Sequence, residues 1–215
     1  IYMNPFPYDK KSKKSILSYA KKLTDKSLSD LGINQDKFEG KGKLGLMVEK
    51  GYFCLDSGNK AEQDFRDAEL ELKVTGIKID NKTKKYKAKE RLVCSMINYY
   101  KISKEEWDGN SFIEKCKNIL FVFYLYEEKK YKNNPEEIRF FEPMIFTFDC
   151  FQKNLIKKDW KIIKQKVLDG KAHELSEGNT DYLGAATKGM GGGSGKDFTR
   201  QPYSNCKAKR RAYSL

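Results

Sequence analysis

The amino-acid sequence predicts an α/β protein in which one mixed central sheet is flanked by helices. Its 215 residues are 39% hydrophobic and 13% aromatic, which is enough for a packed core and excludes wholesale disorder. Runs rich in branched and aromatic residues occupy the middle of the chain, and segments with apolar residues at helical spacing lie on either side of them. This alternation is typical of a single α/β domain.

Helices are expected in the first quarter of the chain, after an extended stretch over residues 2–8. The first covers Ser12–Leu23, where apolar residues recur at helical spacing and Ser12 or Ser15 can serve as the N-cap. Two more are expected: a short one that starts at Ser27 or Ser29, and another between Gly42 and Phe53. Glu49 lies inside the last, otherwise apolar, segment, so a specific role is expected for its carboxylate.

Strands are expected next, and together they should form one antiparallel or mixed sheet. The four runs are Ala68–Ile77, Arg91–Ile97, Ile119–Tyr126 and Ile138–Phe148. A helix over Gln152–Leu168 should follow, ended by Gly170, with Leu155, Ile156, Trp160, Ile163 and Val167 on its inner face. Residues 176–204 show little apolar periodicity and contain a glycine-rich tract at 189–195, which predicts a flexible loop.

The charge balance favours a polyanionic partner. Lys and Arg total 43 against 30 Asp and Glu, a net charge of +13, which suits a nucleic acid. No apolar run is long enough to span a bilayer and no export signal is recognised, so a soluble, cytoplasmic protein without membrane contact is expected. The five cysteines never form a C-x-x-C pair, and His173 is the only histidine. Any metal would therefore be held by carboxylates, as magnesium is.

Asp64, Glu71 and Lys73 form the most informative motif, D-x6-E-x-K. In a strand Glu71 and Lys73 point to one face while their apolar neighbours point into the core, and Asp64 could lie on an adjoining strand or turn beside Glu71. Two carboxylates can hold Mg²⁺, and a neighbouring lysine can orient or activate the water that attacks a phosphodiester.

A plainer interpretation also fits this segment. Asp67, Glu69, Glu71 and Lys73 on one side of a strand could simply be a solvated, charged face. Two features favour the metal site. Glu49, just upstream, supplies a third carboxylate, and the rest of the chain is basic and rich in aromatic residues, as a nucleic-acid-binding surface is.

Glu49 followed by Asp64-x6-Glu71-x-Lys73 resembles the catalytic arrangement of the MutH branch of PD-(D/E)xK nucleases, which includes GATC-specific type II restriction endonucleases. Further blocks look like the GATC restriction enzymes of this group, and they lie at residues 89–93, 97–99, 170–178, 182–183, 187–189, 201–204, 207–209 and 211–215. The resemblance covers most of the chain from about Gly42 to its last residue.

This resemblance implies a restriction-endonuclease-like fold and a Mg²⁺-dependent endonuclease that cuts duplex DNA at GATC. Asp64 and Glu71 would be metal ligands, Lys73 would position or polarise the attacking water, and Glu49 would assist the metal site or a second ion. Lys115 matches a further lysine near the family's active site. Phosphodiester hydrolysis by such a site needs no histidine, and His173, at the exit of a helix, is expected to be structural or to cap that helix.

The basic C-terminal segment is the expected DNA interface. Lys188 aligns with the lysine of the family's recognition loop and is the candidate for base reading, while the other cations would contact phosphates or be solvated. The candidate DNA-binding residues are Lys188, Gly189, Arg200, Lys207, Lys209, Arg210, Arg211, Tyr213 and Ser214. Ser214 stands where the mismatch-repair enzyme has a methylation-sensing tyrosine, which favours restriction over methylation-directed nicking.

We expect one MutH-like nuclease domain over residues 1–215, as part of a longer two-domain protein. Its segments would be an N-terminal helical arm (1–41), a catalytic core (42–170) and the DNA-recognition segment (171–215). The expected partners are GATC duplex DNA and a C-terminal regulatory domain, with a DNA-induced dimer left open. Two alternatives remain: a catalytically silent, allosteric DNA-binding module, and a basic RNA-binding or ribosome-associated domain, which would bind without metal and would not explain the carboxylate spacing.

Overall fold

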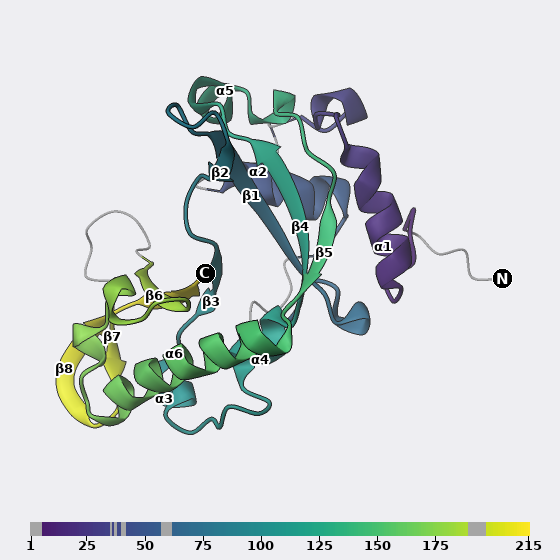
Figure 1. Ribbon diagram of the computed structural model, residues 1–215. Coiled ribbons are helices and arrows are strands. Elements are labelled where there is room, and N and C mark those ends of the chain that lie inside the picture. The colour runs from purple at the N-terminus through teal and green to yellow at the C-terminus, as the bar shows by residue number, and fades with distance from the viewer. Residues whose placement is uncertain (1–5, 35, 37, 40–41, 57–61, 189–196) are drawn as a thin grey trace. The chain divides into compact units, whose positions relative to one another are not determined.

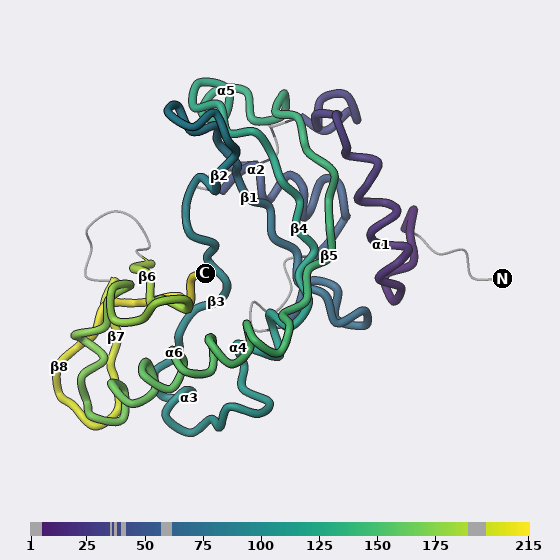
Figure 2. Tube along the Cα trace, in the orientation of Figure 1, coloured from purple at the N-terminus to yellow at the C-terminus, as the bar shows by residue number. Residues whose placement is uncertain are grey.

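The computed structural model describes residues 6–34, 36, 38–39, 42–56, 62–188 and 197–215, and the chain divides into two compact units (Figures 1 and 2). Unit 1 consists of Ile1–Glu90 and Lys117–Thr147, and unit 2 of Arg91–Cys116 and Phe148–Leu215. Each unit draws on two separate stretches of the chain. The division into the segments 1–41, 42–170 and 171–215 stays a prediction.

Unit 1 is built on a four-stranded mixed sheet. Its order is β2 (Tyr86–Ala88), β1 (Glu71–Ile79), β4 (Asn118–Leu125) and β5 (Met144–Thr147). β1 and β4 run parallel over seven residue pairs, from Glu71 opposite Ile119 to Ile77 opposite Leu125. β2 and β5 are antiparallel to their neighbours. The α/β class with a mixed sheet is the restriction-endonuclease-like arrangement expected from the sequence, and it is confirmed.

Short helices accompany this sheet (Figure 1). They are α1 (Lys13–Ala20), η1 (Lys21–Leu23), η2 (Ser29–Leu31), α2 (Lys43–Leu46), η4 (Met47–Tyr52), η5 (Arg66–Ala68), α5 (Glu128–Asn133) and η6 (Pro135–Glu137). The hydroxyl of Ser12 accepts a hydrogen bond from the amide of Ser15 at 3.2 Å, so Ser12 is the N-cap of α1. The expected helix between Gly42 and Phe53 exists as α2 followed by the π-helical turn η4.

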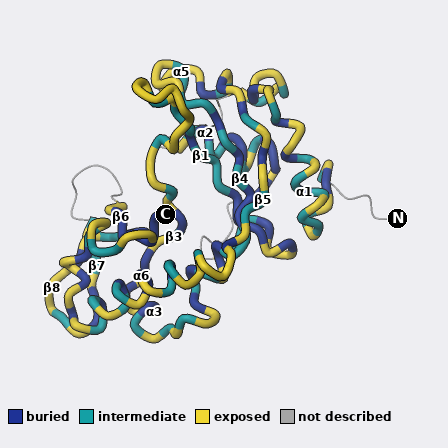
Figure 3. Tube along the Cα trace, in the orientation of Figure 1, coloured by how far each residue is buried: buried dark blue, intermediate teal, exposed yellow. Residues whose placement is uncertain are grey.

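The core of unit 1 joins these helices to the sheet. Leu44, Met47 and Val48 from α2 and η4 are buried in one cluster with Leu72 of β1 and Val122 of β4. α5, by contrast, has no buried residue (Figure 3). An aromatic group lies in the same core, formed by Tyr8, Tyr19, Tyr52, Phe53 and Phe65. Burial of these rings anchors the N-terminal segment to the sheet.

Unit 2 combines a long helix with two small antiparallel sheets. Its helices are α3 (Tyr99–Ile102), α4 (Ser111–Cys116), α6 (Cys150–Leu168), η7 (Ala172–Glu174) and η8 (Glu177–Asn179). One sheet has the order β3 (Val93–Met96), β9 (Arg211–Ser214) and β6 (Gly184–Thr187). β7 (Phe198–Gln201) and β8 (Ser204–Lys209) form the other, a hairpin.

The predicted helix over Gln152–Leu168 is confirmed as α6. Its inner residues Ile156, Trp160, Ile163 and Val167 are at most 1% exposed, which confirms the predicted apolar face. Leu155 is only partly buried. Gly170 ends the region with φ +69°, and a side chain there would meet the backbone of Tyr203, so glycine is required on two counts.

Two expectations about the strands are wrong. The run Arg91–Ile97 does form a strand, β3, but β3 pairs with β9 near the end of the chain and not with the sheet of β1 and β4. Residues 176–204 are not all loop, since they contain β6 and β7. β6 reads Gly-Ala-Ala-Thr, which has weak strand propensity, and it is held by pairing with a distant strand. The glycine-rich tract 189–195 lies outside the described residues.

None of the five cysteines is in a disulfide bond. None of the described helices combines the length and the apolar character that a membrane span requires.

Candidate active site

Asp64 and Glu71 flank a backbone bridge at the start of β1. Phe65 and Leu70 form an antiparallel bridge through two backbone hydrogen bonds, of 2.9 and 3.2 Å. The next residues outward are Asp64 and Glu71, so the bridge brings their backbones close together. The carboxylate of Asp64 also accepts a hydrogen bond from the amide of Leu72 at 2.8 Å. A six-residue turn thus brings together the two acids that the sequence spaces apart.

Glu71 and Lys73 form an ion pair inside unit 1. Nζ of Lys73 lies 2.7 Å from Oε1 of Glu71, and the two side chains are 18% and 2% exposed. The spacing of two residues along β1 places them on the same face, as predicted. That face is not solvated, however. Glu71 is more deeply buried than Leu72 of the opposite face, at 7%, so the division into a polar face and a buried face is wrong here.

The alternative of a continuous charged strand face does not fit the structure. Asp67 lies in the helical turn η5, and Glu69 has φ +50°, a left-handed conformation that interrupts the alternation of a strand. Glu69 instead pairs with Lys117 at 2.8 Å, and this contact lowers the pKa of the exposed Glu69 carboxyl. β1 begins only at Glu71, so Glu71 and Lys73 are set apart from the acids before them.

The donor set of this site suits a hard divalent cation. Magnesium is commonly bound by one or two protein carboxylates and completes its shell with water and substrate phosphate oxygens, which Asp64 and Glu71 would permit. Glu49 lies on η4, in a partly buried position. Among the described residues no group of three or more Asp, Glu, His or Cys side chains is close enough to hold a metal ion, so the structure does not group Glu49 with the pair.

Two further predicted residues lie in unit 2. Lys115 is a buried residue of α4, and its role at the active site stays a prediction. His173 lies in η7, where its Nδ1 is 3.0 Å from Nε2 of the buried Gln201. Gln201 also accepts a hydrogen bond from the amide of Ala172 at 2.7 Å. His173 therefore belongs to a contact that joins η7 to the β7–β8 hairpin, in keeping with the structural role expected for it.

The predicted DNA-binding cations are mostly on the surface of unit 2. Lys188, Arg200, Lys207 and Lys209 are exposed, and Arg210 is partly exposed. Three of them belong to the β7–β8 hairpin, whereas Lys188 directly follows β6. Gly189 lies outside the described residues. The four exposed side chains are accessible to a polyanion from solvent.

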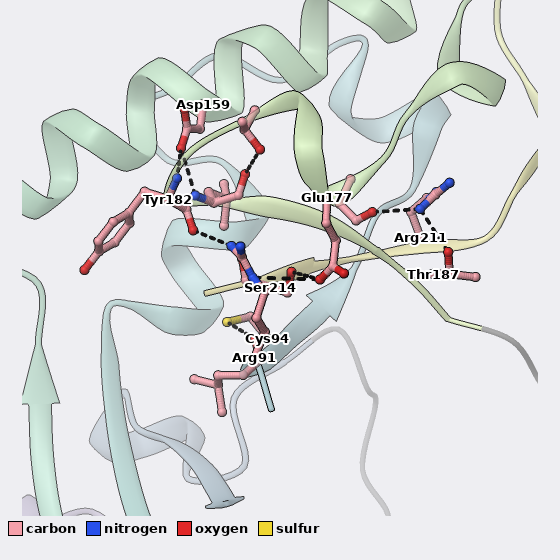
Figure 4. Close-up of polar contacts among 12 residues, drawn as sticks. Arg91, Cys94, Asp159, Glu177, Tyr182, Thr187, Arg211 and Ser214 are labelled. Carbon is pink, nitrogen blue, oxygen red and sulfur yellow. Dashed lines mark hydrogen bonds and ion pairs between the residues drawn. The ribbon is translucent and has the colours of Figure 1, made fainter. Parts of the chain in front are cut away.

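Three other predicted DNA-binding residues are committed to contacts within unit 2. Tyr213 and Ser214 are 3% and 0% exposed, and the hydroxyl of Ser214 donates to Glu177 at 3.1 Å. Arg211 donates to the carbonyl of Ala185 and to the hydroxyl of Thr187 (Figure 4). Tyr213 and Ser214 are therefore interior residues of unit 2.

Sequence reasoning missed a polar cluster at the start of β6. Asp159, 2% exposed, accepts hydrogen bonds from the amides of Tyr182 and Leu183 at 2.6 and 2.8 Å (Figure 4). Arg91 donates to the carbonyls of Tyr182 and Ser214 at 2.7 and 3.2 Å. The one available signal was an aspartate inside the apolar face of a helix, directly before Trp160.

A mixed sheet with two carboxylates and a lysine at the start of a central strand is the arrangement of the PD-(D/E)xK class of nucleases. The model of the family "DNA mismatch repair enzyme MutH" matches residues 53–159, which include Asp64, Glu71 and Lys73. Over 206 residues the chain is 36% identical to the type II restriction enzyme Sau3AI of Staphylococcus aureus. That alignment covers 95% of this chain, and the chain spans 40% of the length of that relative. The chain belongs to the MutH-like nuclease family.

Proposed function

We propose that the chain is the catalytic part of a type II restriction endonuclease that uses Mg²⁺ to cut duplex DNA at GATC. The observation that carries this proposal is the proximity of Asp64 to Glu71 across the Phe65–Leu70 bridge, with Lys73 at 2.7 Å from Glu71. The 36% identity to a type II restriction enzyme supports the reaction class. GATC as the target rests on the sequence blocks that resemble GATC restriction enzymes.

Asp64 and Glu71 would hold the metal ion. When bound, Mg²⁺ lowers the pKa of a coordinated water and offsets the charge that develops on the phosphate. Lys73 lies beside this position, and its ammonium group can donate hydrogen bonds to the attacking water and to a phosphate oxygen. The low exposure of Glu71 and Lys73 keeps competing solvent away, which strengthens their electrostatic interactions.

DNA would be held by the exposed cations of unit 2. Arg200, Lys207 and Lys209, which are exposed on the β7–β8 hairpin, would contact backbone phosphates, which supply affinity but no sequence information. Lys188, after β6, is the candidate for a contact with guanine in the major groove. The buried Tyr213 and Ser214 are not included in this interface.

Cleavage kinetics test the proposal directly. Radiolabelled duplexes with one GATC site, or with a single altered base pair, are incubated with Mg²⁺ or with EDTA. We expect Mg²⁺-dependent cutting only at GATC, and a loss of about a hundredfold or more in rate for Asp64→Asn and for Lys73→Met. Lys78→Ala, on the same strand β1 but on its other face, is the matched control and should cut like the wild type.

The other results separate the alternatives. Removing one partner of a buried ion pair destabilises a protein, so a variant could lose activity by unfolding. Thermal melting of each variant shows whether it is folded. A folded wild type that binds GATC duplex but cuts nothing with Mg²⁺ would support the silent, allosteric module instead. A wild type that prefers RNA, and binds it equally with or without Mg²⁺ and with or without Asp64→Asn, would support the basic RNA-binding domain.

A further inference from the structure

The strand β6 leads directly into Lys188, so whatever holds β6 also holds the backbone of Lys188. β6 pairs antiparallel with β9, and Thr187 lies opposite Arg211. The pairing continues one residue further, since the amide of Lys188 donates to the carbonyl of Arg210 at 3.0 Å. β6 is an edge strand of only four residues. Backbone pairing on one side alone holds such a strand weakly.

The side chain of Arg211 makes further hydrogen bonds to β6, in addition to the backbone pairing. Its Nη1 donates to the carbonyl of Ala185 at 3.0 Å and to the hydroxyl of Thr187 at 2.9 Å (Figure 4). Both acceptors belong to β6, and Thr187 is the residue before Lys188. A planar guanidinium group that bonds two points of one strand restrains its direction as well as its position. Arg211 is partly exposed, and its Nη1 donates both of these hydrogen bonds to β6.

The opposite end of β6 is held independently. Asp159 accepts the amides of Tyr182 and Leu183, just before the strand begins, and Arg91 donates to the carbonyl of Tyr182. The two ends of the strand are therefore fixed by different side chains. Only the Arg211 end adjoins Lys188, so a change there alters the setting of Lys188 without loosening the start of β6.

We propose that Arg211 is a positioning residue for sequence discrimination, acting through the hydroxyl of Thr187 on the backbone of Lys188, and not a contact to DNA phosphate. This inference rests on the proposed function, in which Lys188 reads a base. A base contact discriminates well only if the side chain that makes it is held in place before binding. If the side chain is mobile in the free protein, ordering it on binding costs conformational entropy, and this cost lowers the affinity for the correct sequence.

Binding to a GATC duplex and to a duplex with one altered base pair tests the inference. Fluorescence anisotropy is measured with Mg²⁺ in an Asp64→Asn background, so that DNA is not cut. The discrimination ratio is the Kd for the altered duplex divided by the Kd for GATC. We expect Thr187→Val to lower this ratio about fivefold, the worth of one hydrogen bond, while Thr187→Ser keeps the hydroxyl and stays within about twofold of the parent.

Arg211 variants distinguish positioning from a direct phosphate contact. Arg211→Lys keeps the positive charge but loses the pair of hydrogen bonds to Ala185 and Thr187. If Arg211 positions Lys188, this variant should have a lower discrimination ratio and an unchanged dependence of Kd on salt. A direct phosphate contact predicts the reverse: Arg211→Lys keeps the ratio, and Arg211→Ala weakens binding to both duplexes and reduces the slope of log K against log salt by about one. The second pattern would overturn the inference.

Control variants distinguish failure of the inference about Arg211 from failure of the proposed function. Thr199→Val, on β7 of the same unit, matches the chemical change of Thr187→Val away from Lys188 and should leave the ratio unchanged. Lys188→Ala should lower the ratio, and adding Thr187→Val to it should lower it no further. If the parent shows no preference for GATC, the proposed function fails. If the parent and Lys188→Ala behave as expected but Thr187→Val keeps full discrimination, only the inference about Arg211 fails.

Discussion

Glu71 is an acidic residue at a position that is 2% exposed, and this combination shapes the active site. Burial of a carboxylate is costly unless an opposite charge is close, and Nζ of Lys73 is 2.7 Å away. The same low exposure that makes the pair costly for folding makes it effective for phosphodiester chemistry, because electrostatic interactions weaken in contact with water. Both properties follow from the placement of Glu71 on a central strand.

Asp159 is expected to matter for stability in a way that its sequence position does not reveal. Asp159→Asn leaves the atoms in place but exchanges a charged acceptor for a neutral amide, so the bonds to the amides of Tyr182 and Leu183 weaken. We expect the free energy of unfolding to fall by about 2 kcal/mol in urea titrations followed by circular dichroism. Asp181→Asn, at a side chain 92% exposed, is the control and should change little. Equal stability of the two variants would contradict this role.

At the scale of an element, α6 is a helix whose start and end are set by residues close to it in the sequence. Asp149 and Gln152 form a capping box, in which the carboxylate of Asp149 accepts the amide of Gln152 at 2.7 Å and the side chain of Gln152 accepts the amide of Asp149 at 3.0 Å. The cap starts the helix and Gly170 ends the region. α6 was therefore predictable, whereas β6 was not, because β6 depends on pairing with residues 24 or more positions away in the sequence.

The cap of α6 supports a quantitative prediction. Asp149→Ala removes the acceptor of the first-turn amide, so the free energy of unfolding should decrease by about 1 kcal/mol. Thermal and urea unfolding measure the change. Asn154→Ala, at an exposed position of the same helix, serves as the control and should be neutral or slightly stabilising, since alanine is the better helix former. A loss of stability in Asn154→Ala as large as that in Asp149→Ala would argue against the cap.

At the scale of the whole molecule, buried tyrosines should limit stability in alkali. Burial raises the pKa of Tyr99 to about 12 and, in the same direction, the pKa values of Tyr8, Tyr52, Tyr124 and Tyr213. Above about pH 10 the unfolded chain loses these phenolic protons while the folded chain keeps them. The unfolded state then binds fewer protons, so the free energy of unfolding falls as pH rises, by about 1.4 kcal/mol per pH unit for each retained proton.

Urea unfolding between pH 9 and pH 11.5 measures this effect. Tyr99→Phe removes one ionisable phenol, so stability should fall less steeply between pH 10 and pH 11.5 than in the wild type, although the lost hydrogen bond to the carbonyl of Lys209 lowers it at every pH. Tyr203→Phe, at a residue 68% exposed, should leave the slope unchanged. Identical slopes for the wild type and Tyr99→Phe would show that Tyr99 does not contribute.

The sequence by itself determined what depends on neighbours along the chain. It predicted the helix α1 with its N-cap, the helix α6 with its end at Gly170, the strands β1, β3 and β4, the D-x6-E-x-K motif and the basic character of the C-terminal segment. Periodicity, capping residues and motif spacing act over fewer than about ten residues, so the sequence displays them directly. Asp64 and Glu71 are of this kind, because a turn of six residues brings them together.

Only the tertiary structure decided which distant segments meet. It separated β3 from the sheet of β1 and β4, buried Glu71 beside Lys73 on the face expected to be polar, and placed Tyr213 and Ser214 in the interior. It also assigned Asp159, Arg91 and Arg211 to the support of β6. The physical reason is the same in each case. Burial and strand pairing depend on residues far away in the sequence, and the local sequence pattern does not identify those residues.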